Sequence, residues 1–499
     1  MTSKYIAALE IGSSRIKGIV AAVGTDGRLR PLAVEEVASG DSVRYGRIRN
    51  AREAGNLISD LVRRLENNPR VAPGRIASVF IADGGRSLLS APSSSSISFN
   101  GEEEITHTTL ERLNKEALFN LGTDRDVLVI APRRFFVDSA EVKKIVGTFG
   151  KTVRGEFTLI TQAPENRRAL ERIIIESSGA DINRDYVTRL LAQTESALTD
   201  SDRQVGSLFI DFGAETTSLA VFREGALVFA ATLPIGASNI ARDLSSALSV
   251  TLDKATQIMH TKGEAIVDTA RYEAADTEVA EIVGYVSSRA KEIVANVNNI
   301  LEEAGYKASD FPEGAVIAGG GIMLKGFPEM IEQLIKIKVR KAAIDPSSVT
   351  PTPDIDIDRN FDVLCLAKYA AAHSTTDCLV FPAQPNDEHP ESEQNPNTPP
   401  VEGQSNINHD SERLARNATM GGKRTPPADD DPNLLKDDDI DQPDNINNDT
   451  DDQELPQQQD DPNKTRLTLL EKIKKIGRNT ANLITGAAIE EIENDGMDD

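Results

Sequence analysis

The chain has no tryptophan, only two cysteines, and aromatic residues at just 4% of its 499 positions. Cys365 and Cys378 are too few for a disulfide framework, so we expect reduced, incidental thiols. No apolar run approaches the roughly 18 residues of a membrane-spanning helix, and the first residues lack the pattern of a signal peptide. These absences predict a cytosolic protein.

Basic residues are also in short supply, since 55 lysines and arginines face 79 acidic residues, which gives a net charge of −24. A nucleic-acid partner is disfavoured, because phosphate binding requires a basic face. The length allows roughly three domains.

The acidic residues concentrate in one stretch. Residues 382–463 contain 21 acidic and 5 basic residues, 12 of the 24 prolines and no aromatic side chain. Such a composition cannot bury enough apolar surface to offset chain entropy. We therefore predict a disordered acidic linker at 381–463, with a reach of at least roughly 50 Å.

Periodicity returns after this linker, in residues 464–488. Leu469, Ile473, Ile476, Thr480, Leu483 and Ala487 follow a spacing of four and three residues, which predicts one helical face. Six basic residues against Glu471 alone give the segment a charge of +5. A basic amphipathic helix of this kind lies in a membrane interface. The predicted membrane contacts are Leu469, Lys472, Ile473, Lys475, Ile476 and Leu483.

Docking of this helix on a partner protein or on the body of the chain stays open as an alternative, which the lack of Trp and Phe favours. The acidic tail at 489–499 would also oppose an anionic surface.

Two blocks far apart in the chain share one pattern, an apolar strand that ends on a carboxylate, a turn of small residues and a second strand. The carboxylates are Glu10 and Asp211. The turns contain Gly12, Ser13 and Ser14 in the first block, and Gly213, Thr216 and Thr217 in the second. Such turns let N–H and hydroxyl groups approach an anion, and a carboxylate can hold a cation through water. The pattern predicts a site for a nucleotide polyphosphate, with Mg²⁺ held through water by Glu10 and Asp211.

A third block, residues 315–322, is a buried-type strand that runs into Gly319, Gly320 and Gly321. Three glycines suit a close backbone approach to a flat base or ribose. A strand before a glycine turn is most often only a hairpin, but three such blocks in this order are a stronger signal.

Together the blocks resemble the phosphate 1, phosphate 2 and adenosine motifs of the actin superfamily. Within it, residues 4–372 resemble the FtsA family of bacterial division proteins, and Glu10, where most members have aspartate, is itself an FtsA-like trait. The resemblance implies an α/β fold, an actin-like ATPase of two domains that clamp ATP. The predicted nucleotide contacts are Gly12, Ser13, Ser14, Lys17, Asp211, Gly213, Thr216, Thr217, Gly236, Lys262, Gly319, Gly320 and Gly321.

Some of the chemistry departs from the family. The phosphate 2 turn carries Glu215, which would repel a phosphate, so we expect it to point outward or to act only through Mg²⁺. Arg189 stands where the acid of filament-forming relatives would fall. Gln193 is a candidate catalytic residue in its place, with an ordinary surface glutamine as the alternative. ATP hydrolysis is therefore expected to be slow at most.

The resemblance also implies a domain plan, with a small α+β insert that resembles the FtsA-specific subdomain. The predicted pieces are domain 1A at 1–83, 163–204 and 339–380, the insert 1C at 84–162, domain 2A at 205–235 and 309–338, domain 2B at 236–308, the linker at 381–463, the amphipathic helix at 464–488 and the tail at 489–499. The main expected elements are strands at 5–10, 15–23, 32–38 and 76–82 and helices from residue 50 and at 166–177, 238–262, 277–304 and 361–372.

This plan predicts a peripheral protein on the cytoplasmic face of the inner membrane, at the division site. The resemblance implies that it anchors FtsZ there, contacts other divisome proteins and self-associates into short filaments. An actin-fold small-molecule kinase would not explain an acidic tether that ends in a basic helix. A DnaK-type chaperone would need a β-rich peptide-binding domain that the aromatic-free tail cannot supply. Another actin-like filament protein also stays open.

Overall fold

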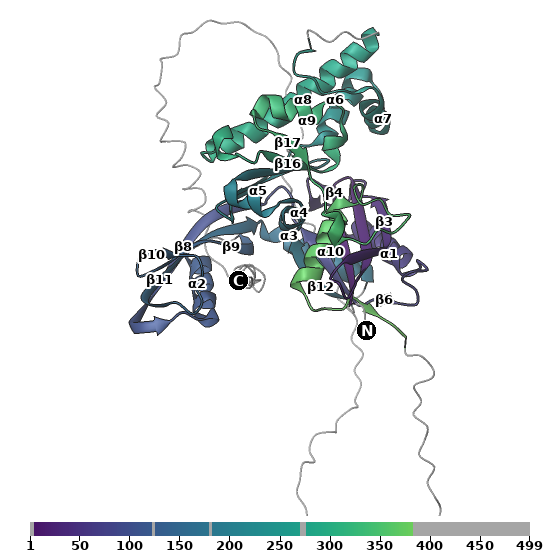
Figure 1. Ribbon diagram of the computed structural model, residues 1–499. Helices are drawn as coiled ribbons and strands as arrows, with labels where there is room; N and C mark the ends of the chain where they lie inside the picture. Colours follow the sequence, from purple (N-terminus) through teal and green to yellow (C-terminus); the bar gives the residue numbers. More distant parts are fainter. Residues whose placement is uncertain (1–3, 122–124, 179–181, 270–275, 383–499) are drawn as a thin grey trace, which may run out of the picture. The chain divides into compact units, whose positions relative to one another are not determined.

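The computed structural model describes residues 4–121, 125–178, 182–269 and 276–382 (Figure 1). The predicted linker, except its first two residues, lies outside this part of the chain. So do the predicted membrane helix at 464–488 and the acidic tail at 489–499.

The first half of the fold contains a five-stranded sheet in the order β12-β7-β1-β2-β3. Strands β1 (Lys4–Ile11) and β2 (Arg15–Val23) form the predicted antiparallel hairpin, and β3 (Leu29–Ala38) extends it. Strands β7 (Ser78–Asp83) and β12 (Asn183–Thr188) add in parallel on the other side. The four strands expected here are confirmed, and the central β1 is apolar and buried along most of its length, as a strand covered on both faces must be.

Helices α1 (Ala51–Glu66) and α10 (Phe361–His373) pack against this sheet. The helix expected from residue 50 is α1, and Asn50 caps it, because the Asn50 side chain accepts a hydrogen bond from the N–H of Glu53 at 3.1 Å. Gly18 lets α1 approach β2 closely, since a Cβ there would lie 2.4 Å from Leu61. Helices α3 (Pro164–Ser178) and α4 (Arg189–Ala197) follow the insert.

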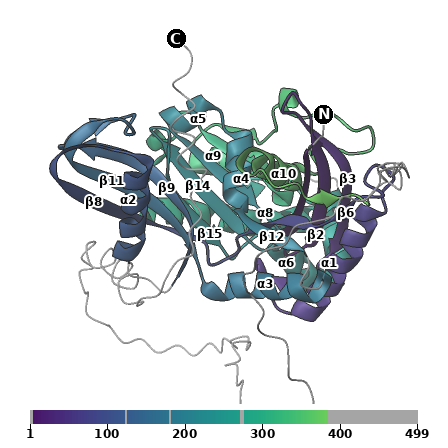
Figure 2. The ribbon, with the colours of Figure 1, turned by 90° about the horizontal axis from the view of Figure 1, so that it is seen from below.

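The second sheet has nine strands, because the insert and the second half of the fold share it. In spatial order its strands are β10 (Ala140–Val142), β9 (Asp126–Val137), β11 (Phe149–Gln162), β8 (Leu89–Glu104), β15 (Ala226–Leu233), β14 (Thr217–Arg223), β13 (Ser207–Phe212), β16 (Ala315–Ala318) and β17 (Val339–Lys341). The insert joins the rest of this sheet through one residue pair, Leu89 and Ala231. Figure 2 shows β8 and β11 as one curved layer with α2 (His107–Leu121) beside it.

Helices of the second half gather around β16 and β17 (Figure 1). They are α6 (Ala237–Leu248), α7 (Leu252–Lys262), α8 (Thr277–Glu303) and α9 (Phe327–Ile335), and the short α5 (Asp200–Val205) precedes β13. The prediction of one helix over 238–262 is wrong. Ser249 adopts a left-handed conformation that ends α6, and Thr251 caps α7.

The remaining elements are short. Among them are β4 (Val43–Arg44), β5 (Arg47–Ile48), β6 (Arg75–Ile76), β18 (Leu379–Val380) and the 3-10 turns at Ala308–Asp310, Gly320–Met323 and Pro346–Ser348. Cys365 and Cys378 are free and buried, as expected. No helix in the described ranges is long and apolar enough to cross a bilayer.

Candidate nucleotide site

The three predicted motifs meet around one cavity of about 390 Å³, within the size range of small-molecule sites. Ten of the predicted nucleotide contacts line it, together with Glu10. They are Gly12, Ser13, Ser14, Lys17, Asp211, Gly213, Thr216, Gly319, Gly320 and Gly321. The fold thus brings together residues that the sequence separates by more than three hundred positions.

The two hairpin turns are built alike. The Gly12 N–H donates to the Arg15 carbonyl at 3.0 Å, and the Gly213 N–H donates to the Thr216 carbonyl at 2.8 Å. A Cβ on either glycine would lie 2.9 Å from that same carbonyl oxygen. Both positions therefore require glycine to keep the turn closed.

The glycine triplet is equally constrained. Gly319 has a φ of +89°, and a Cβ there would lie 2.4 Å from the Phe212 carbonyl oxygen and 2.5 Å from a carboxylate oxygen of Asp211. The backbone after β16 therefore lies directly against the phosphate 2 strand. Side chains that are mostly uncharged line another part of the cavity, namely Ala241, Thr256, Met259, His260 and Met323.

Helix α6 begins on the phosphate 2 turn. The N–H groups of Ala237 and Ser238 donate to the carbonyls of Gly213 and Ala214 at 3.1 and 2.7 Å. Gly236 precedes them, and a Cβ there would lie 2.6 Å from both carbonyl oxygens. Gly236 itself does not line the cavity, so its place is to seat the helix against the turn.

Three other predicted site residues lie outside the cavity lining. The Thr217 hydroxyl is buried and donates to the Ile235 carbonyl at 2.8 Å. The Lys262 ammonium forms an exposed ion pair with Glu278 at 2.9 Å. Gln193 is fully buried, so the alternative of a surface glutamine is wrong. Its amide donates to Asp362 at 2.9 Å.

Arg189, the first residue of α4, lies between the two hairpins. One terminal nitrogen of its guanidinium is 3.1 Å from Oε1 of Glu10, and the other is 3.1 Å from Oδ2 of Asp211. The Arg189 side chain is only 19% exposed, and it lines the cavity. The carboxylates at the ends of both motif strands thus already bind a cation that the chain supplies.

Burial and the neighbouring charges together set the pKa values of Glu10, Asp211 and Arg189. Burial and the nearby carboxylate of Asp362 raise the pKa of Glu10 to about 7, against the pull of Arg189. Burial likewise raises the pKa of Asp211, which Arg189 opposes. Burial works against the charge of Arg189, but Asp211 and Glu10 outweigh it and raise the pKa of the guanidinium. Arg189 therefore stays charged at any physiological pH.

The site does not fit the predicted Mg²⁺. Glu10 and Asp211 were to hold this ion through water, yet an oxygen of each binds Arg189. The sequence shows that Arg189 departs from the family pattern. It does not show that Arg189 binds Glu10 and Asp211, because these partners lie on two separate strands.

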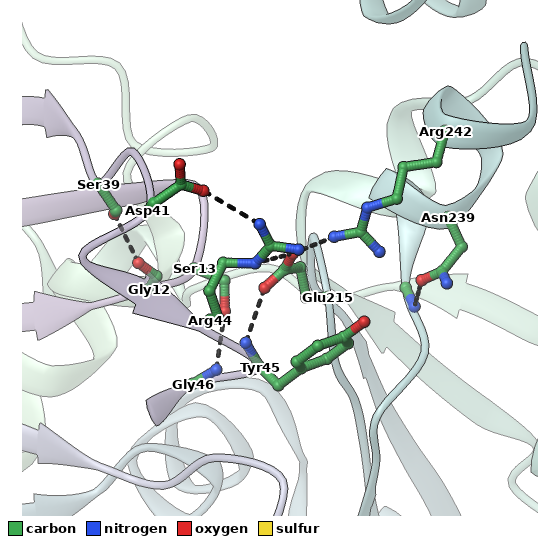
Figure 3. Close-up of polar contacts among 11 residues, drawn as sticks. Gly12, Ser13, Ser39, Asp41, Arg44, Tyr45, Gly46, Glu215, Asn239 and Arg242 are labelled. Atoms are coloured by element: carbon green, nitrogen blue, oxygen red, sulfur yellow. Dashed lines mark hydrogen bonds and ion pairs between the residues drawn. The ribbon is translucent and has the colours of Figure 1, made fainter. Parts of the chain in front are cut away.

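Glu215 does not line the cavity, in keeping with the expectation that it points away from a phosphate, but it is buried rather than exposed to solvent. Its side chain is buried, accepts a hydrogen bond from the N–H of Tyr45 at 2.7 Å, and pairs with Arg44 at 3.0 Å and with Arg242 of α6 (Figure 3). Beside it, the Gly46 N–H donates to the Ser13 hydroxyl at 2.8 Å. The phosphate 2 turn is thus bound to the loop between β4 and β5. No local pattern could reveal these partners.

Comparisons with known proteins agree with this architecture. A family model described as "Cell division protein FtsA" matches residues 208–356, and one described as "SHS2 domain inserted in FTSA" matches residues 85–161. The second match falls on the predicted insert, although the exact boundaries of the domains stay predictions.

Curated relatives match over most of the folded body. "Cell division protein FtsA" of Porphyromonas gingivalis is 25% identical over 75% of this chain and 80% of its own length. The protein of the same name from Pseudomonas aeruginosa is 24% identical over 71% and 86%. Among solved structures, a "PilM-PilN type IV pilus biogenesis complex" has the same fold, with a TM-score of 0.52 and 15% identity over 74% of this chain and 99% of that one. The chain thus matches the FtsA family of cell division proteins in its second half and in its insert, and it has the actin-like fold with an SHS2 insert.

Proposed function

We propose that this FtsA-family protein binds ATP in the cavity and links the division machinery to the membrane. The observation that carries nucleotide binding is the pair of matched glycine turns, which meet the Gly319–Gly321 backbone around one cavity. Turns built from glycine, serine and threonine leave backbone N–H groups and hydroxyls accessible to an anion. The less charged wall with Met259 and Met323 suits the base.

Hydrolysis is proposed to be slow. A water that attacks the terminal phosphate needs a residue to orient it, and the position expected for that acid carries Arg189. The buried amide of Gln193 is held by Asp362 and does not line the cavity. Turnover is therefore expected well below the roughly 1–100 s⁻¹ of kinases.

Calorimetry on the full chain tests the nucleotide site. We expect ATP to bind with a Kd well below about 1 mM. Gly213→Ala should abolish binding, because the new methyl group would lie 2.9 Å from the Thr216 carbonyl. Gly101→Ala is the matched control, since a Cβ there meets nothing within 4 Å. Absence of ATP binding by the parent protein would rule out the proposal.

The membrane link rests on the sequence after the folded body. The proposed anchor is the basic amphipathic segment 464–488, and the acidic linker would hold the body away from an anionic surface while it contacts FtsZ. Each basic residue near such a surface contributes on the order of 1 kcal/mol, so attachment should be reversible and sensitive to salt. Self-association into short filaments is proposed from family membership alone.

Flotation with anionic liposomes tests the anchor. Replacement of both Ile473 and Ile476 by Glu should release the protein, whereas deletion of residues 489–499 should tighten its attachment, because it removes acidic charge next to the helix. Neither change should alter ATP binding. If the double variant floated like the parent, the segment would be a protein-docking helix instead.

A further inference from the structure

We propose that Arg189 takes the place of a divalent cation, so that the site binds a nucleotide polyphosphate without any metal ion. The inference rests on the nucleotide binding proposed above and adds a statement about how the phosphate charge is balanced. It concerns Arg189, which contacts both motif carboxylates at once.

The first argument is geometric. A metal ion in this fold would be held through water between the carboxylates at the ends of the two motif strands. The guanidinium of Arg189 lies between these carboxylates, 3.1 Å from Glu10 and 3.1 Å from Asp211. A water-bridged ion would have to share the two carboxylates with Arg189 and would approach a buried positive charge. Both effects disfavour it.

The second argument is that Arg189 is held in place. It opens α4, whose following residues Leu190 and Ala192 are buried and whose length packs against α10. Its partner carboxylates lie on β1 and β13, two central strands. If Arg189 left this position, two buried carboxylates would lose their positive partner. Leaving a buried charge without its partner is energetically costly.

The third argument is chemical. A guanidinium has five N–H donors in a planar fork, and it remains charged at any pH at which the protein is folded. Glu10 and Asp211 each use one oxygen on it, and Arg189 also lines the cavity. The guanidinium can therefore also donate hydrogen bonds to a phosphate that enters the cavity. Arginine often binds phosphate through two such bonds.

Binding measurements with and without metal test the inference on the full chain. The affinity for ATP is measured by calorimetry in Mg²⁺ and again in EDTA. We expect the two Kd values to agree within about threefold. A loss of affinity of more than about tenfold in EDTA overturns the inference. Absence of binding in both buffers would instead overturn the proposed nucleotide site.

A charge-removing variant tests the role of the residue. Arg189→Gln keeps most of the side chain's length but loses its charge, so ATP affinity in EDTA should fall by about tenfold or more. Mg²⁺ should then restore part of it, because Glu10 and Asp211 are released. Arg63→Gln is the control, since Arg63 is 71% exposed on α1, where its ion pair is with the exposed Asp60. Unchanged binding by Arg189→Gln in EDTA would overturn the inference.

A direct count of metal decides the matter even if Arg189→Gln does not fold. The parent protein is dialysed against ATP and Mn²⁺, and bound nucleotide and bound Mn²⁺ are quantified, the latter by electron paramagnetic resonance. We expect far fewer than one protein-bound Mn²⁺ for each bound ATP. A ratio of one to one would show that the metal enters with the nucleotide and would overturn the inference.

Discussion

At the scale of single residues, the roles of some site residues can be predicted from the sequence and those of others cannot. Gly12 and Gly213 were predictable, because each follows a strand and a carboxylate in a recognisable order. The contacts of Arg189 and Glu215 were not. Arg189 pairs with Glu10, which lies 179 positions away, and Glu215 binds Tyr45, which lies 170 positions away. Pairings over such distances are set by tertiary packing rather than by any local pattern.

Cys378 gives a prediction about pH. Burial raises its pKa to about 11, so the native state keeps the proton at pH values where the unfolded chain loses it. The native state then binds more protons, and stability falls as pH rises between about 9 and 11. Urea unfolding at pH 8 and pH 10 should show a loss of about 1 kcal/mol that Cys378→Ala lacks. Equal losses in both proteins would contradict this.

At the scale of elements, the strands and most helices follow from apolar periodicity and caps. The β1–β2 hairpin, the start of α1 near residue 50 and the α8 helix agree with the predictions. The break between α6 and α7 was not predicted, because Ser249 takes a left-handed conformation that is usually signalled by glycine.

Gly236 carries the prediction at this scale. Gly236→Ala would drive a methyl group to within 2.6 Å of two carbonyls that bind the start of α6. We expect a loss of about 1–3 kcal/mol in the free energy of unfolding, together with weaker ATP binding, because α6 must withdraw from the phosphate 2 turn. Gly284→Ala on α8 is the matched control. Its Cβ would meet nothing within 4 Å, so it should be neutral or stabilise by up to about 1 kcal/mol.

At the scale of the whole folded body, Glu215 binds one side of the cavity to the other. Glu215→Gln would leave Arg44 and Arg242 near one another without their shared carboxylate. Since both arginines are about one-third exposed, we expect a modest cost of about 1–2 kcal/mol and faster release of bound nucleotide.

Urea unfolding and stopped-flow release of a fluorescent ATP analogue measure these two effects. Glu224→Gln should leave both the stability and the release rate unchanged. Glu224 is 65% exposed, and its ion pair with Arg223 is long, at 3.8 Å. If Glu215→Gln released nucleotide at the parental rate, the contacts of Glu215 would be structural only.

The single β8–β15 pair has a mechanical meaning. In the chain, the insert lies between β7 and α3 of the first half, yet it is bonded to the second half by the pair of Leu89 with Ala231, by the Ala230 N–H to the Ser90 hydroxyl at 2.8 Å, and by the Thr232 N–H to the Leu88 carbonyl at 3.0 Å. A hinge motion that widened the cavity would therefore either break these contacts or move the insert together with the second half. We expect the position of the insert relative to the first half to change when the cavity opens.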